Sequence, residues 1–167
     1  MFTETEFVAI VNRHQAGVWR YLRLLGCEAA LADDLTQDTF VRVIGALPAF
    51  RGESSARTWL LSIARRACAD DIRRTQRRRG LLQRLQSLRP PDAASGLGYA
   101  EVDDLVRRLD PDRRDAFVLT QLIGLSYEEA ADVCGCPVGT IRSRVARARV
   151  ELLSATAEDE DQRRLRP

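Results

Sequence analysis

Residues 125–153, which read LSYEEAADVCGCPVGTIRSRVARARVELL, constrain the fold more than any other part of the chain. Ser126 and Glu129 form an S-x-x-E capping box, which predicts the start of a helix. Gly135 predicts the end of that helix and permits a sharp turn, and Pro137 is typical of the start of the next helix. Two short helices joined in this way are predicted to form a helix-turn-helix.

The second of these helices has an apolar side and a basic side. At 100° per residue, four apolar side chains fall on one narrow stripe, which is predicted to pack on the domain: Ile141, Val145, Ala148 and Leu152. The opposite front consists of Ser143, Ala146, Arg147 and Val150, and the flanks of Arg142, Arg144 and Arg149. Such a helix fits a DNA major groove, with its flanks on phosphates and its front on base edges. The alternative is an ordinary amphipathic helix with a solvated arginine face.

The rest of the chain shows apolar residues at helical spacing and no convincing strand alternation. This spacing predicts helices over residues 5–25, 29–46 and about 56–78, and further short helices before the helix-turn-helix. In the second and third helices, we expect Ile44 and Ile72 to face a core.

A break in this pattern divides the chain into two parts. Residues 80–98 contain Pro90 and Pro91 followed by small polar residues, so we expect a flexible linker, with a helical turn at 81–88 as an alternative within it. After it, Asp110 and Pro111 predict the N-cap and the first position of a helix. The predicted fold class is all-α, with two small helical domains joined by a flexible linker and a helix-turn-helix in the C-terminal one. The predicted boundaries are 1–79 for the first domain, 80–98 for the linker, 99–155 for the second domain and 156–167 for a charged, disordered tail.

The composition favours an anion-binding protein that does not enter membranes. All 26 basic residues among the 167 are arginines, whose guanidinium fork suits phosphate and carboxylate, although codon bias in a GC-rich genome is an alternative cause. No apolar run approaches the roughly 20 residues that a membrane span needs. The first residues lack a basic region followed by an apolar one, so we expect no secretion signal and a cytoplasmic location.

The sequence gives the four cysteines no clear role in disulfides, metal binding or catalysis. A reducing cytosol disfavours disulfides between Cys27, Cys68, Cys134 and Cys136, and we expect small buried thiols. The C-x-C of the last two has no matching ligands, and the single histidine, His14, is distant in the sequence. We therefore predict no metal site, no cofactor and no catalytic residue.

A second basic stretch covers residues 64–79, which read ARRACADDIRRTQRRR. Trp59 lies just upstream of it and Phe50 lies in the preceding loop. A basic face beside aromatic rings can hold single-stranded nucleic acid by phosphate attraction and base stacking. The alternative is that Trp59 belongs to the core and the arginines are solvated.

The predicted second helix differs from these basic segments. Asp34, Gln37 and Asp38 follow one another at i, i+3 and i+4 and so share one face. An acidic face cannot favour DNA, but it suits a protein partner that carries positive charge. The alternative is a solvated helix face.

Three segments together resemble a known family. They are DDLTQDTF at 33–40, FRGESSARTWLLSIARRACADDIRR at 50–74 and GLSYEEAADVCGCPVGTIRSRVARAR at 124–149. In this order they resemble the extracytoplasmic-function (ECF, group 4) sigma factors of the bacterial sigma-70 family. The resemblance runs from about Phe7 to Leu153.

The resemblance implies a dissociable specificity subunit of RNA polymerase that is not itself an enzyme. It implies that Asp34, Gln37 and Asp38 bind the clamp helices of the largest polymerase subunit, and that the flap of the second-largest subunit is also contacted. It implies that the linker threads the active-site and RNA-exit channels. Promoter DNA is the other implied partner, and an anti-sigma factor is a further candidate partner.

The resemblance also implies two DNA sites. The minus-10 element is melted, and one of its bases flips into a pocket in the loop. The residues that the resemblance implies there are Phe50, Arg51, Ser54, Ser55, Arg65, Arg66, Arg73 and Arg74. At the duplex minus-35 element they are Thr140, Arg142, Ser143, Arg144, Arg147 and Arg149. Arg66 stands where many members have asparagine, and Ala146 replaces a bulkier residue, so the chain departs from the common pattern at both sites.

Two other functions compete with this interpretation. A stand-alone helix-turn-helix repressor or activator would bind duplex DNA tightly without polymerase. A metal-dependent nuclease would use carboxylates such as those at 33–34 and 70–71, but adjacent aspartates on a helix point about 100° apart and do not converge on one ion.

Overall fold

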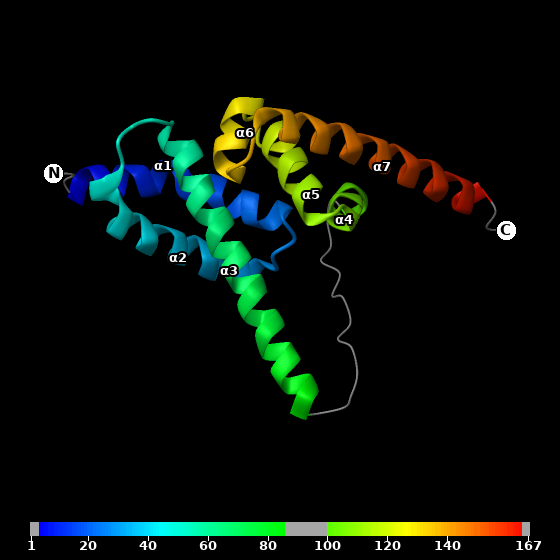
Figure 1. Cartoon of the computed structure of the whole chain (residues 1–167), viewed down its shortest axis with the longest axis horizontal. Coiled ribbons are helices and arrows are strands. Elements are labelled where there is room, and N and C mark those ends of the chain that lie inside the picture. Colours follow the sequence, from blue (N-terminus) through cyan, green and yellow to red (C-terminus); the bar gives the residue numbers. More distant parts are fainter. Residues whose placement is uncertain (1–3, 86–99, 165–167) are drawn as a thin grey trace.

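The computed structural model describes residues 4–85 and 100–164, and within them every regular element is a helix (Figure 1). The all-α prediction is therefore confirmed for the described part of the chain. The elements in chain order are α1 (Glu4–Leu24), α2 (Ala29–Ala46), η1 (Leu47–Ala49), α3 (Ala56–Leu85), α4 (Ala100–Arg108), α5 (Pro111–Phe117), η2 (Val118–Leu122), α6 (Tyr127–Cys134) and α7 (Val138–Arg164).

Helices α1, α2 and α3 pack on one another and form the first half of the molecule. Their shared core is apolar, because side chains at helical spacing on each of them turn inward: Tyr21, Leu22, Val43 and Leu60 are fully enclosed. The C-terminal turns of α3 project beyond α1 and α2 (Figure 1). Only the first turns of α3 therefore have an apolar stripe that this core can cover.

The second half consists of α4 to α7, and its helix ends follow the signals in the sequence. Asp110 Oδ1 accepts a hydrogen bond from the Asp112 backbone N at 3.1 Å, so Asp110 caps α5. At α6, Ser126 N donates to Glu129 Oε2 at 2.9 Å and Glu129 N donates to Ser126 Oγ at 3.1 Å, which completes the predicted capping box. Gly135 ends α6 in the left-handed conformation, with φ 65°.

Helix α5 continues as the π-helical segment η2, which the sequence did not predict. The Ile123 backbone N donates to Val118 O at 2.9 Å, one residue further back than in an α-helix. Within the segment, Thr120 Oγ1 donates to Ala116 O at 2.8 Å, so the hydroxyl is satisfied although it is buried. The wider turn ends at Gly124, which has φ 79°.

The two halves lie against each other and share one apolar core. Helix α3 packs on α6, and α1 contacts α4 and η2. One cluster of buried side chains continues from Leu60 and Ala64 of α3 to Ala130 and Val133 of α6. The two predicted domains are thus docked on one another in this structure, so the surface of each half depends on the other.

Several expectations about boundaries and burial were wrong. Helix α3 does not stop before a linker at residue 80 but continues to Leu85, because no breaker stronger than Gly80 interrupts it. The predicted tail is helical to Arg164, because it contains good helix formers and no proline before Pro167. Ile44 and Ile72 do not face the core but are 58% and 50% exposed. Residues 86–98 of the predicted linker lie outside the described residues.

Candidate nucleic-acid interface

Helix α7 presents the basic face that its sequence predicts. Ile141, Val145 and Ala148 are at most 1% exposed, whereas Ser143 and Arg147 on the opposite side are exposed. The dry stripe packs on α5 and α6, which fixes the rotation of the helix about its axis. The residues proposed to read DNA therefore face away from the protein.

The turn before α7 is held by backbone hydrogen bonds. The Cys136 backbone N donates to Ala131 O at 3.1 Å, and the Thr140 backbone N donates to Pro137 O at 2.9 Å. Ser143 Oγ donates to Thr140 O at 2.9 Å, so this hydroxyl is tied back to the helix. The first turn of α7, which enters a groove first in a helix-turn-helix, is thus firmly positioned.

The four arginines in the first half of α7 fall into two classes. Arg144 is partly buried and forms an ion pair with Asp112 of α5, and Arg149 Nη2 donates to Gln121 Oε1 at 2.8 Å. Arg142 and Arg147 are exposed and make no ion pair with any side chain that the structure describes. The second pair is available to a nucleic acid without breaking a protein contact.

The loop before α3 forms an aromatic pocket. The Phe50 and Trp59 rings lie with centroids 4.5 Å apart and planes inclined by 32°. They line a cavity of about 310 Å³ together with Arg51, Glu53 and Ser54. Trp59 is half-buried and packs on the core, and its ring also lines this cavity. Aromatic rings beside an arginine suit the stacking of an unpaired base.

Ser55 has a structural role that its sequence position did not reveal. The Thr58 backbone N donates to Ser55 Oγ at 3.1 Å, and the Ser55 and Thr58 hydroxyls lie 2.8 Å apart. Ser55 therefore caps the first turn of α3. It fixes the angle at which the pocket loop meets the helix.

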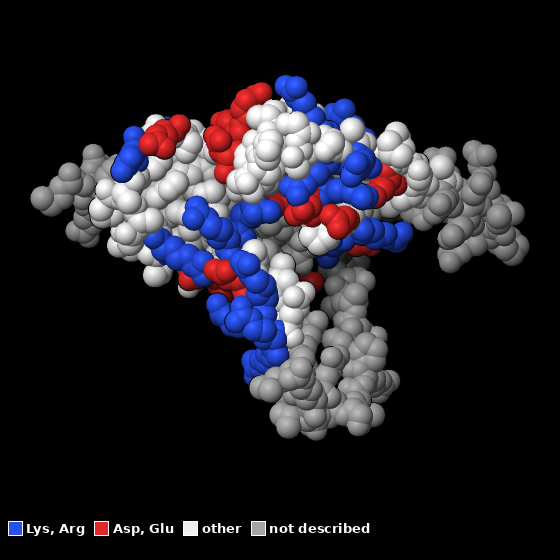
Figure 2. All heavy atoms as spheres, in the orientation of Figure 1, with Lys and Arg blue, Asp and Glu red and all other residues white. Residues whose placement is uncertain are grey.

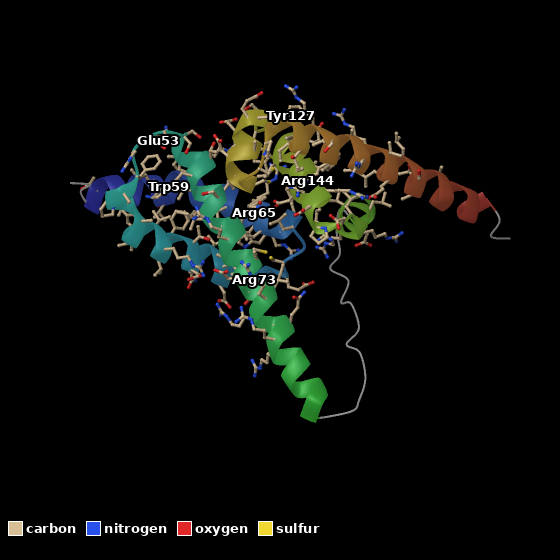
Figure 3. The ribbon with its side chains drawn as sticks, viewed as in Figure 1. Glu53, Trp59, Arg65, Arg73, Tyr127 and Arg144 are labelled. Carbon is tan, nitrogen blue, oxygen red and sulfur yellow. The ribbon has the colours of Figure 1, made fainter. Side chains whose placement is uncertain are left out.

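The arginines of α3 form a band along the helix (Figure 2). Arg66 bonds back to Ser62, through Nε to the carbonyl at 3.1 Å and through Nη2 to Oγ at 3.0 Å. Arg73 Nη2 lies 3.0 Å from Asp70 Oδ1, and Arg74 is exposed. Trp59, Arg65 and Arg73 follow one another down the helix (Figure 3).

Arg65 is engaged in a buried polar network that joins the two halves. Its guanidinium pairs with Asp115 of α5, and Tyr21 OH donates to the other oxygen of that carboxylate at 2.5 Å. Burial lowers the pKa of Arg65, but the charge and hydrogen bond of Asp115 outweigh it and the pKa is raised. Burial raises the pKa of Tyr21 well above its usual value, and Asp115 adds to the effect. Both groups therefore keep their protons.

Other contacts between the halves use residues at the start of α3 and at the α1–α2 turn. Arg57 Nη2 donates to Ile123 O at 2.6 Å, and Thr58 Oγ1 lies 3.3 Å from Glu129 Oε1. Arg114 Nη1 donates to Leu25 O at 2.8 Å. The second half thus covers one side of α3 close to the predicted minus-10 residues.

The predicted acidic face of α2 is exposed. Asp34 and Gln37 are exposed, whereas Asp38 pairs with Arg42 at 2.9 Å. Arg42 also pairs with Asp70 of α3 at 2.9 Å, and hydrogen bonding from Arg42 lowers the pKa of Asp70. Asp38 is therefore partly committed to holding α2 on α3.

Two apolar residues enlarge this face. Val41 and Ile44 are 66% and 58% exposed, and at 100° per residue both fall on the side of Asp34 and Gln37. This apolar extension was not predicted from the sequence, because Ile44 was expected to face the core. Their spacing from Gln37, at i+4 and i+7, is the signal that could have found them.

Neither a metal site nor a membrane span is found in the part of the chain that is described. No three histidine, cysteine or acidic side chains among those residues gather closely enough to bind a metal ion. None of the described helices is both long and apolar enough to cross a bilayer.

Comparison with known families assigns both halves. The family "Sigma-70 region 2" matches residues 10–78, and the family "Sigma-70, region 4" matches residues 99–152. The first match covers most of α1, all of α2 and most of α3, and the second covers the helix-turn-helix. The two arginine-rich helices therefore lie in different sigma regions.

Curated relatives agree over most of the chain. The ECF RNA polymerase sigma factor SigC of Mycobacterium tuberculosis is 49% identical over 160 residues, which cover 92% of this chain and 84% of that protein. The ECF RNA polymerase sigma factor EcfG of Rhodopseudomonas palustris is 36% identical over 133 residues, 77% of this chain and 72% of that protein. The ECF RNA polymerase sigma-E factor of Escherichia coli is 34% identical over 132 residues, 70% and 69% of the two chains.

Solved structures give the same result. The sigma factor RpoE of Bartonella quintana, in complex with the anti-sigma factor NepR, superposes with a TM-score of 0.71 at 28% identity, over 89% of this chain and 95% of that one. CnrH in complex with the cytosolic domain of CnrY gives 0.73 at 29% identity, over 94% and 91%. With both sigma regions in the expected order on one chain, this protein belongs to the sigma-70 family and is an RNA polymerase sigma factor of the extracytoplasmic-function group.

Proposed function

We propose that this sigma factor binds core RNA polymerase through α2 and places two different arginine surfaces on the two elements of a promoter. Helix α7 reads the minus-35 element as duplex, and the loop 50–57 with α3 holds the melted minus-10 element. The observation that carries the proposal is the presence of regions 2 and 4 on one chain, each with a positioned basic helix.

The geometry of α7 supports duplex recognition. A helix that enters the major groove needs one apolar side that packs on its own domain. Its opposite side must approach the base edges without a bulky side chain in the way. Arg142 and Arg147 are exposed beside Ser143, and arginine makes bidentate contacts with guanine O6 and N7. Thr140, Arg144 and Arg149 lie at the edges of this face and suit phosphate contacts.

The pocket beside Trp59 supports capture of an unpaired base. Its volume of about 310 Å³ lies at the lower end of the range for small-molecule sites. Stacking on an aromatic ring contributes about 1–3 kcal/mol per base, which offsets the few kcal/mol that unstacking costs. Arg66, Arg73 and Arg74 are exposed along α3 and suit the backbone of the parted strand.

Arg65 can join this surface only after the halves separate. In the docked arrangement its guanidinium is paired with Asp115, and Thr58 lies against Glu129. We infer that binding to core polymerase, which spaces the two sigma regions along the promoter, releases both contacts.

Two protein surfaces suit the polymerase. The α2 face combines Asp34 and Gln37 with the exposed apolar Val41 and Ile44, which is the mixed character of a protein interface. On region 4, a cavity of about 390 Å³ between η2 and the middle of α7 is lined by Phe117, Leu152, Leu153 and neighbouring residues, and we assign it to the flap of the second-largest subunit.

An anti-sigma factor is a further proposed partner. The RpoE structure contains the anti-sigma factor NepR, and CnrH is likewise in complex with another protein, the cytosolic domain of CnrY. A protein that covers the α2 face or the α7 front of this chain would block polymerase or promoter. We propose that the chain has no enzymatic activity of its own and acts only through these partners.

Run-off transcription with core polymerase and a library of promoters tests the proposed function. We expect new start sites only when the sigma factor and core polymerase are both present, and weak duplex binding by the sigma factor alone. A stand-alone repressor would instead bind duplex DNA tightly without polymerase, and a nuclease would cleave it in Mg²⁺.

The α2 face is tested best at Asp34. Because Asp38 is paired with Arg42, charge reversal at Asp38 also disturbs the contact between α2 and α3. Asp34→Arg changes an exposed carboxylate instead, and we expect it to abolish capture of core polymerase while circular dichroism stays unchanged. Asp132→Arg, on α6, is the matched control. Normal core capture by Asp34→Arg would remove α2 from the proposed interface.

A further inference from the structure

Two cysteines from distant parts of the sequence meet in the first half. Cys27 ends the turn between α1 and α2, Cys68 lies in α3, and their Sγ atoms are 3.6 Å apart. Both are free thiols and nearly buried, with 7% and 5% exposure. A disulfide needs an S–S distance of about 2.05 Å, so the sulfurs have to approach by about 1.5 Å.

The surroundings make the two thiols unequal. A hydrogen bond from Cys68 lowers the pKa of Cys27, against the effect of burial, and the charges of Arg23 and Arg107 lower it further. The same hydrogen bond, together with burial, raises the pKa of Cys68. Cys27 is therefore the thiol of the pair that loses its proton more easily, and the thiolate is the reactive form of a cysteine.

A cavity reaches the Cys68 side of this pair. Cys68 lines a cavity of about 220 Å³ between α3 and α5, and Leu25, two residues before Cys27, lines it as well. A water molecule takes about 30 Å³ of liquid volume, so the cavity has room for hydrogen peroxide.

We propose that Cys27 and Cys68 form an oxidation site, at which a peroxide converts the two thiols into an intramolecular disulfide between the α1–α2 turn and α3. The Cys27 thiolate attacks one peroxide oxygen, the O–O bond breaks, and water leaves after protonation. Cys68 Sγ then attacks the sulfenic sulfur, the S–O bond breaks, and the oxygen leaves as a second water with the Cys68 proton. Two thiols lose two electrons and two protons, and the peroxide gains them. Disulfides in the cytosol are mostly transient and redox-sensing, as this one is proposed to be.

The site lies directly beneath a contact between the halves. Arg114 of the second half donates to Leu25 O at 2.8 Å, and Arg23 Nη1 donates to Cys27 O at 2.8 Å. The disulfide closes a loop from residue 27 to residue 68 within region 2 and so restricts the unfolded chain. We expect the oxidised protein to unfold several degrees above the reduced protein, since cross-links of this span stabilise small domains.

The test uses the full chain, reduced and then treated with increasing hydrogen peroxide under native conditions. After remaining thiols are alkylated, we expect a monomer with two fewer alkyl adducts than the reduced control. Once the adducts are subtracted, its mass should be about 2 Da lower because two hydrogen atoms are lost, and a protease fragment should join the Cys27 and Cys68 peptides. Dithiothreitol should restore both alkylation and the lower unfolding temperature.

Three variants keep the test decisive. Cys134→Ala/Cys136→Ala should retain the cross-link, whereas Cys27→Ala and Cys68→Ala should each lose it, with circular dichroism to confirm folding. Recovery of Cys27 and Cys68 as free thiols, a sulfinic acid at Cys27 without a cross-link, or bonds only between molecules would each overturn the proposal. Equal yield of the same cross-link in urea would also overturn it, since the folded geometry would then play no part.

Discussion

Helices α3 and α7 are both long and rich in arginine, yet they offer their charges in different ways. On α7, Arg142 and Arg147 are exposed and form no ion pair with a described side chain. On α3, Arg65 is paired with Asp115 of the other half, and Arg73 is paired with Asp70 one turn away. Whether an arginine can bind nucleic acid thus depends on the carboxylates around it rather than on the number of arginines.

The side chains near Arg147 explain why its guanidinium forms no ion pair with a described side chain. Glu151 follows Arg147 at i+4, where it is a candidate partner, but it pairs with Arg113 instead. Asp115 has the opposite effect on α3, because it lies 6% exposed between Arg65 and Tyr21 and ties that helix to α5. Arg142 and Arg147 are therefore exposed in this arrangement, whereas Arg65 becomes accessible only after a rearrangement.

The largest effect is expected from breaking the network on α3. Asp115→Ala removes the acceptor shared by Tyr21 and Arg65, and we expect it to lower the free energy of unfolding by about 2–3 kcal/mol. We expect no more than the lower end of the free-energy cost of breaking a buried ion pair, because the Arg65 side chain keeps 26% exposure. Urea denaturation measures the loss.

The matched control is Asp132→Ala, which removes an exposed carboxylate of α6. It should change the free energy of unfolding by less than about 0.5 kcal/mol. Equal losses in the two variants would show that Asp115 does not link the halves.

A smaller or comparable free-energy change is expected from a substitution on α7. It affects DNA binding rather than the stability of the fold. Arg147→Ala should weaken binding of the polymerase holoenzyme to the minus-35 element by about 1–3 kcal/mol, because a bidentate base contact is lost. Competition between intact and altered minus-35 duplexes measures it. Arg108→Ala, at the end of α4, is the control, and an unchanged promoter preference in Arg147→Ala would contradict base reading by this residue.

The smallest effect concerns the protonation of Tyr21. Its pKa is raised in the folded state, so the folded protein keeps the proton while the unfolded chain loses it near the usual value of about 10. The contribution of this proton to the free energy of unfolding is fully present below about pH 10. It is lost as the pH rises further, by up to about 1.4 kcal/mol per pH unit. Tyr21→Phe should show a shallower loss in urea denaturation between pH 9 and pH 11, values chosen to bracket that pKa at about 10. Parallel curves for the two proteins would contradict the buried role of this phenol.

Local signals in the sequence predicted much of the fold. The caps at Asp110 and Ser126 and the end of α6 at Gly135 depend on residues within one turn, and all three predictions were confirmed. The rotation of α7 was also predictable, because the stripe of Ile141 and Val145 has one solution at helical spacing.

Features that depend on distant residues were not predictable. Asp115 meets Arg65 from 50 positions away and Tyr21 from 94 positions away, and no local pattern marks such partners. Ile72 has the spacing of a core residue, but it is 50% exposed and lines the cavity between α3 and α5. The turns of α3 that follow project beyond α1 and α2 (Figure 1). Periodicity gives the face of a helix, but it does not say how far the covering elements extend.

The roles of the two arginine surfaces stay predictions, and footprinting of the holoenzyme on a single promoter tests them most directly. We expect protection of duplex at the minus-35 element, lost in Arg147→Ala, and permanganate-reactive thymines at the minus-10 element, lost in a combined Arg66→Ala/Arg74→Ala variant. The reverse pairing of variants and footprints, or no opening of the minus-10 element in the presence of core polymerase, would contradict the division of labour between α7 and α3.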